Sequence, residues 1–112
     1  MSKKALTAKE KKILFQIKRL VSQEFEIDKL FFYGSRVDGT ATHFSDYDIL
    51  IITKKDMDWH QKRRISDLTL EVDIEYDVVT DIKVYSKNDI KNSLLGHTPF
   101  MENVISQGLI YE

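Results

Sequence analysis

Two aspartates separated by one residue stand directly before an apolar run. Asp46 and Asp48 precede the run from Ile49 to Ile52. Because side chains alternate between the faces of a strand, these two carboxylates would stand side by side on one face. Such a pair repels unless a cation neutralises it, and sites built from oxygen ligands suit hard cations such as Mg²⁺. For the pair taken alone, a solvated strand start is the alternative interpretation.

A Gly-Ser-Arg sequence lies upstream of the two acids, after the apolar stretch Leu30 to Tyr33. Gly34 would let the backbone turn sharply or approach a ligand closely. Ser35 offers a hydroxyl and a backbone N–H, and Arg36 offers a planar fork of donors that matches phosphate oxygens. These residues predict a phosphate-binding turn. An ordinary strand-to-loop turn is the alternative, because the Gly-Ser dipeptide is common.

A third acid lies in the segment Asp77 to Tyr85, which its Val, Ile and Tyr content predicts to be a strand. Alternation places Asp77, Asp81 and Lys83 on one face of that strand. A carboxylate in the middle of a strand is costly among apolar neighbours unless it is paired, whereas an acid at the strand start costs little. Asp81 is therefore favoured as a site residue. An edge-strand acid facing solvent is the alternative.

The rest of the chain supplies the elements that must position these acids. Thr7 and Glu10 form a capping-box pattern, and Asp56 or Asp58 can start a second long helix with Trp59 as a packing anchor. The expected order is a helix over 8–25, strands over 30–33 and 46–53, a helix ending near Tyr76, a strand over 77–85, and short helices after Ser86 and Thr98. This order predicts an α/β (α+β) domain with a small mixed β-sheet and flanking helices.

Composition limits the classes of protein to which the chain can belong. Its 112 residues suit one domain, predicted over 1–112, and a net charge of −1 gives no basic field for direct nucleic-acid binding. The absence of cysteine excludes disulfides and thiolate metal sites. No apolar run is long enough for a transmembrane helix or a signal peptide, so we expect no membrane association and a cytoplasmic location.

The segment "GSRVDGTATHFSDYD" resembles the Gly-Ser, ten-residue spacer, Asp-x-Asp signature of the minimal nucleotidyltransferases, in the DNA polymerase beta-like superfamily. The segment "TDIKVYSKNDI" is similar to the third strand of that family, with Asp81 at the position of its third carboxylate and Asp77 as a competitor. The order of elements agrees over nearly the whole chain. The resemblance therefore implies the polymerase beta-like nucleotidyltransferase fold.

What the resemblance implies is transfer of AMP from ATP to an acceptor hydroxyl. Asp46, Asp48 and Asp81 would hold Mg²⁺, as two ions, and Asp81 would accept the proton of the hydroxyl. Gly34, Ser35 and Arg36 would bind the phosphates. The preference for ATP follows from the resemblance alone.

The short chain also resembles the antitoxin half of two-component pairs. The partner there is an all-helical HEPN-type ribonuclease toxin, and the family implies AMP transfer to a tyrosine of that toxin. One alternative is a binding module that neutralises a partner by contact, with a vestigial site. Another is a small-molecule nucleotidyltransferase, which would normally need a second domain or a homo-oligomer.

Overall fold

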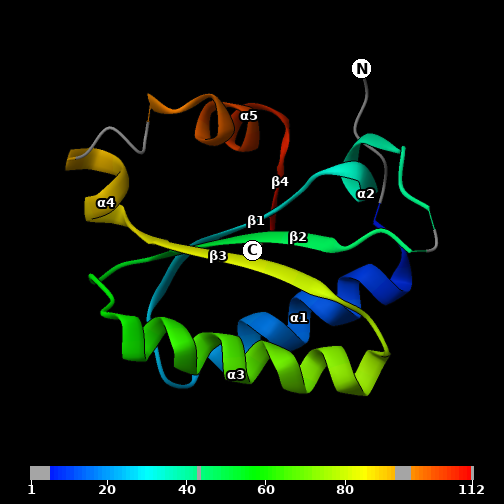
Figure 1. The fold of residues 1–112 in the computed structure, drawn as a ribbon, viewed down its shortest axis with the longest axis horizontal. Coiled ribbons are helices and arrows are strands. Elements are labelled where there is room, and N and C mark those ends of the chain that lie inside the picture. Colours follow the sequence, from blue (N-terminus) through cyan, green and yellow to red (C-terminus); the bar gives the residue numbers. More distant parts are fainter. Residues whose placement is uncertain (1–5, 43, 93–96, 112) are drawn as a thin grey trace.

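The computed structural model describes residues 6–42, 44–92 and 97–111 and shows an α+β architecture (Figure 1). The predicted fold class, a small mixed sheet with flanking helices, is confirmed. The elements are α1 (Ala8–Ser22), β1 (Ile27–Tyr33), α2 (Ser35–Asp38), β2 (Tyr47–Thr53), α3 (Trp59–Tyr76), β3 (Thr80–Ser86), α4 (Lys87–Asn92), α5 (Pro99–Gln107) and β4 (Leu109–Tyr111).

The strands form one sheet in the order β3-β2-β1-β4. β1 is antiparallel to both β2 and β4, whereas β2 and β3 are parallel. A parallel pair needs a long crossover connection, and α3 supplies it. In Figure 1, α1 and α3 lie together on one side of the sheet and α5 lies on the other.

Alternation along the strands gives the sheet two buried faces. Leu30, Phe32, Ile49 and Ile51 pack against α1 and α3 in the larger core. Phe31, Leu50 and Ile52 form a smaller core with Met101 and Val104 of α5. Because Asp48 is two residues before Leu50, it lies on the α5 face of the sheet.

The caps of the helices are confirmed. Thr7 and Glu10 form the predicted capping box, with bonds of 2.9 and 3.1 Å. Ser86 and Asp89 make the same reciprocal pair before α4, and the Thr98 hydroxyl accepts a bond from Met101 N–H at the start of α5.

Two predicted boundaries near the first turn are wrong. α1 ends at Ser22 rather than at Phe25, because the N–H groups of Glu24 and Phe25 both bond back to the Val21 carbonyl in a closing turn. β1 begins at Ile27 rather than at Leu30. An irregularity of the β1–β2 register between Ile27 and Lys29 interrupts the alternation that would have revealed the strand start.

Two further expectations need correction, and one strand was missed. The third strand begins at Thr80, because Asp77 caps the end of α3 in the left-handed conformation, with φ 54°. Trp59 is not a packing anchor, since 65% of it is exposed. The short strand β4 was not predicted. Across the described ranges, no helix is both long enough and apolar enough to cross a membrane.

Candidate active site

Asp48 and Asp81 lie opposite each other in neighbouring strands. The parallel register of β2 and β3 pairs Asp48 with Asp81, and the antiparallel register of β1 and β2 pairs Asp48 with Tyr33. Asp48 is half-buried, whereas Asp81 is exposed. Asp46 is exposed and lies one residue before β2. The fold thus brings together carboxylates that are 33 positions apart in the sequence.

The Asp48 carboxyl lies in an unfavourable electrostatic environment. Its pKa is raised above the ordinary value, first by burial and then by the negative charges of Asp81 and Asp46, while Lys83 acts in the opposite direction. Asp46 is therefore close enough to act on Asp48 although it lies outside the strand. Like charges held together in a folded chain are typical of a site that binds a cation or a protonated group.

Lys83 occupies the same face of the sheet and pairs with Asp81. Its Nζ lies 3.2 Å from Asp81 Oδ2 and 5.5 Å from the centre of the Phe100 ring on α5. Alternation had placed Lys83 on the face of Asp81, but no function was predicted for it. The sequence did contain an indication that Lys83 belongs to the site, because this lysine lies two residues after a proposed metal ligand on the same strand.

Tyr33 is a site residue that sequence reasoning missed. Its hydroxyl is buried and, among the described residues, has no hydrogen-bond partner in acceptable geometry. Burial raises the pKa of Tyr33 and nearby Lys83 opposes that effect, so this lysine is close to both Tyr33 and Asp81. A buried hydroxyl without a partner is a group that a ligand can satisfy.

We expect Lys83→Met to raise the pKa of Asp48. The methionine keeps most of the aliphatic stem but removes the positive charge that now favours the ionised carboxylate. Carboxyl chemical shifts followed by NMR over a pH series would measure the change. An unchanged or lower Asp48 pKa would contradict the assignment of Lys83 as the neighbouring cation.

Gly34 sits against the Asp48 carboxylate at the junction of β1 and α2. Its φ is 84° and its ψ −158°, a region open essentially to glycine alone. A Cβ added at Gly34 would lie 3.1 Å from Asp48 Cγ and overlap Oδ2. Ser35 follows directly, and its carbonyl accepts the N–H groups of Gly39, Thr40 and Ala41 in a compact turn. Gly34 is therefore adjacent to the Asp48 carboxylate, and Ser35 follows it in the chain.

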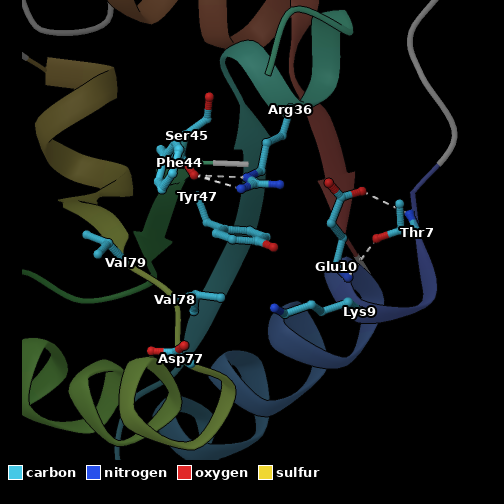
Figure 2. Close-up of a pocket in the computed structure, with 10 residues that line it drawn as sticks. All are labelled: Thr7, Lys9, Glu10, Arg36, Phe44, Ser45, Tyr47, Asp77, Val78 and Val79. Carbon is cyan, nitrogen blue, oxygen red and sulfur yellow. Dashed lines mark hydrogen bonds between the residues drawn. The ribbon is translucent and has the colours of Figure 1, made fainter. Parts of the chain in front are cut away.

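Arg36 points away from this group of residues. Its Nε and Nη2 donate to the Ser45 carbonyl at 3.2 and 2.8 Å, and its guanidinium lies 3.9 Å from the centre of the Tyr47 ring. Figure 2 shows these contacts beside a cavity of about 550 Å³ lined also by residues of α1. Because Tyr47 lies on the α1 face, the structure does not bring Arg36 beside Asp48. In the structure, Arg36 fixes the end of the loop before β2 through its hydrogen bonds to the Ser45 carbonyl.

Asp77 lines that same cavity, below Val78 in Figure 2. It is the cap residue of α3 and lies outside β3. Asp81, in contrast, is the direct register partner of Asp48. The topology therefore favours Asp81 over Asp77 as the third carboxylate.

The side chains near Asp48 carry the kind of donor atom, carboxylate oxygen, that hard cations bind. Asp46, Asp48 and Asp81 offer only carboxylate oxygens, the ligands that Mg²⁺ prefers. In the part of the chain that the structure describes, no three acidic or histidine side chains already enclose a metal position. Asp81 turns instead to Lys83. The residues fit a magnesium site in the chemistry of their donors, and their side chains would have to converge to form it.

Comparison with known proteins identifies the family. The family model described as "Polymerase beta, Nucleotidyltransferase" matches residues 15–112. The chain belongs to the polymerase beta nucleotidyltransferase family. No curated protein matches the sequence.

Solved structures agree with the fold of this family. A candidate nucleotidyltransferase from Sulfolobus solfataricus has a TM-score of 0.60 and 18% identity, over 90% of this chain and 78% of the other. A mutant of the toxin–antitoxin MntA–HpeT has a TM-score of 0.57 and 14% identity, over 89% and 70%. A toxin–antitoxin structure with AMP-PNP has the same values. At such identities the likeness shows a shared polymerase beta nucleotidyltransferase fold.

Proposed function

We propose that this nucleotidyltransferase domain moves AMP from ATP to a hydroxyl group of a partner protein in a Mg²⁺-dependent reaction. The observation that carries the proposal is the pairing of Asp48 with Asp81 in adjacent strands, with Gly34 leaving space at the Asp48 carboxylate. The fold likeness to a toxin–antitoxin complex and to one with AMP-PNP supports a protein partner and an adenine nucleotide. A helical HEPN-type toxin is the partner that the resemblance implies.

In the proposed reaction, the acceptor oxygen attacks the α-phosphorus of ATP. The new oxygen–phosphorus bond forms as the bond to the bridging oxygen breaks, and pyrophosphate leaves. Asp46, Asp48 and Asp81 would hold Mg²⁺, which supplies charge neutralisation of the triphosphate. Asp81, whose side chain is exposed, would take the proton of the acceptor hydroxyl.

The other residues of the site would position the substrate. Gly34 lets the backbone approach the phosphates, and the Ser35 hydroxyl offers them a donor. Lys83 is a cation beside the acids and would have to release Asp81 when the site fills. On the same face, the buried Tyr33 hydroxyl makes no hydrogen bond in acceptable geometry to any described residue, and it would be available to the substrate. Arg36 reaches phosphate only if it leaves the Ser45 carbonyl and the Tyr47 ring.

We expect a purified partner toxin to gain the mass of one AMP when incubated with this chain, ATP and Mg²⁺. Intact-mass spectrometry measures the gain, and fragmentation locates the modified hydroxyl. Removal of the metal with a chelator should return the modification to background, because the acids alone cannot neutralise the triphosphate.

Asp81→Asn and Asp77→Asn form a matched pair for the same assay. Asp81→Asn should reduce labelling by about 100-fold or more, since it removes a metal ligand and the proposed base. Asp77→Asn should leave labelling within about twofold, because asparagine also tolerates the left-handed cap conformation. Equal losses in the two variants would contradict the assignment of Asp81.

The Lys83–Asp81 ion pair favours a second candidate function. Lys83 already neutralises the Asp81 carboxylate, so the folded site does not require a metal ion to offset that charge. This is the arrangement expected in a domain that acts by binding its partner and not by catalysis. In that case the chain would inhibit its partner without any change in the partner's mass. Inhibition that persists in Asp48→Asn without labelling would decide for contact and against catalysis.

A further inference from the structure

The outward face of α3 carries apolar side chains that nothing in the described structure covers. Trp59, Leu70 and Ile74 are 65%, 53% and 74% exposed. At 100° per residue, these three and Arg63 fall on one stripe, opposite the buried residues Ile65, Leu68 and Val72. Figure 1 shows α3 on the opposite side of the sheet from α5, and Asp48 lies on the α5 face by alternation with Leu50.

The charges of α3 are separated along its length. Its Lys and Arg residues, Lys62, Arg63 and Arg64, lie in its first half, and three of its four acids, Glu71, Asp73 and Glu75, lie in its second half, with Asp67 next to the midpoint. No acid lies in its first turn and no base in its last. This order is opposite to the one that the helix dipole favours. An isolated helix therefore gains nothing from it, whereas an antiparallel neighbour centred between Ser66 and Asp67 would bring Lys62 and Arg63 beside Glu71 of the other copy.

The stripe is also symmetric about its centre. Trp59 and Ile74 are equally far from the midpoint between Ser66 and Asp67, and so are Arg63 and Leu70. A two-fold axis at that midpoint places Trp59 of one copy level with Ile74 of the other. It also brings the basic turn with Arg63 level with the acidic turn that holds Glu71. A self-complementary patch of this kind is what an isologous dimer requires.

We infer that α3 is the interface of a homodimer in which two copies pack antiparallel about the midpoint between Ser66 and Asp67. The apolar ends supply the contact, and the charges set the antiparallel direction and exclude the parallel one. Arg64 is already bonded to Glu24 at 2.7 Å, so Arg63 is the basic residue free to reach across within the described part of the chain. Both candidate active sites face away from the interface and remain open.

Cysteine cross-linking gives a direct test because the native chain contains no cysteine. Ser66→Cys lies next to the axis and should form a covalent dimer readily under mild oxidation. Ile74→Cys should not, because its two copies would lie about 22 Å apart along the helices. The double variant Trp59→Cys with Ile74→Cys should cross-link again. Efficient cross-linking of Ile74→Cys alone would overturn the antiparallel arrangement.

Sedimentation velocity over a concentration series tests the dimer without cross-links. Arg63→Glu should raise the dimer dissociation constant about tenfold or more, and Arg63→Glu with Glu71→Arg should restore it. High salt should weaken the native dimer, since exposed charge pairs are screened. Ile105→Ser on α5 removes an equally exposed apolar side chain, 51% exposed, and should change nothing. Circular dichroism confirms that each variant is folded.

A chain that remains monomeric throughout the series would overturn the inference. So would a dimer that persists unchanged in Arg63→Glu, because its interface would then lie elsewhere. If the α3 variants weaken binding of a helical partner protein and have no effect on self-association, the stripe belongs to that partner and the homodimer is wrong.

Discussion

We expect Asp48→Asn to abolish nucleotidyl transfer and at the same time to raise the melting temperature of the chain at neutral pH. The loss should be about 10³-fold or more, because Asp48 is a proposed metal ligand and such a ligand contributes several kcal/mol to the stabilisation of the transition state. The gain in stability has a separate cause. Burial and the charges of Asp81 and Asp46 raise the pKa of Asp48, so the ionised carboxylate is less favourable in the folded chain than in the unfolded one.

The sign of this effect fixes its pH dependence. A carboxyl whose pKa is raised by folding contributes its full stability below its ordinary pKa of 3.8 and loses that contribution as pH rises through the raised value. At pH 7, asparagine removes the free-energy cost of the ionised Asp48 carboxylate. At pH 3 the native carboxyl is protonated, so the substitution has no such cost to remove. Thermal unfolding at the two pH values measures the difference. A variant less stable than the native chain at pH 7 would contradict the electrostatic account.

Gly34→Ala should lose both stability and activity. Alanine is strained at φ 84° and ψ −158°, which costs about 1–3 kcal/mol, and its Cβ would also collide with the Asp48 carboxylate. That carboxylate must move, so the proposed metal ligands lose their arrangement. Urea unfolding and the AMP-transfer assay measure the two effects.

Gly39→Ala is the control that separates backbone strain from the collision. Gly39 also has a positive φ, 88°, but nothing lies within 4 Å of the position of an added Cβ. We expect Gly39→Ala to lose about 1 kcal/mol of stability and to keep its activity. In an Asp48→Ala background, Gly34→Ala should cost less than in the native chain, because the carboxylate is gone and only the Cβ of residue 48, at 3.3 Å, stays close. An undiminished cost there would show that strain alone explains Gly34.

The faces on which Asp48 and Asp81 lie were predictable because they depend on alternation along strands, whereas the direct pairing of the two residues depends on the register between β2 and β3. Asp48 precedes an apolar run and Asp81 interrupts one. The alternation within each run therefore indicates the face of the sheet on which the aspartate lies. The capping residues Thr7, Ser86 and Thr98 were predictable for a similar reason, since their bonds span only three residues. Local chemistry was sufficient in these cases.

Other features depend on contacts that the sequence does not specify. Arg36 contacts the Ser45 carbonyl and the Tyr47 ring and does not point toward a phosphate position. The packing of the loop determines this orientation. Asp77 ends a helix where a strand was expected, because a short polar side chain suits both positions. The strand β4 spans three residues, too few to show a period, and forms only because the β1 edge is available to it. Tyr33 gave no signal of its own.

β3 is an edge strand of the sheet, and this position sets how firmly the paired acids are held. An edge strand has one neighbour, here β2, and can detach by local opening while the β1–β2 ladder stays intact. Repulsion between Asp48 and Asp81 favours that opening at neutral pH. A ligand that neutralises the pair would stabilise the closed strand, so nucleotide and metal should slow hydrogen exchange of the β3 amides more than that of β1.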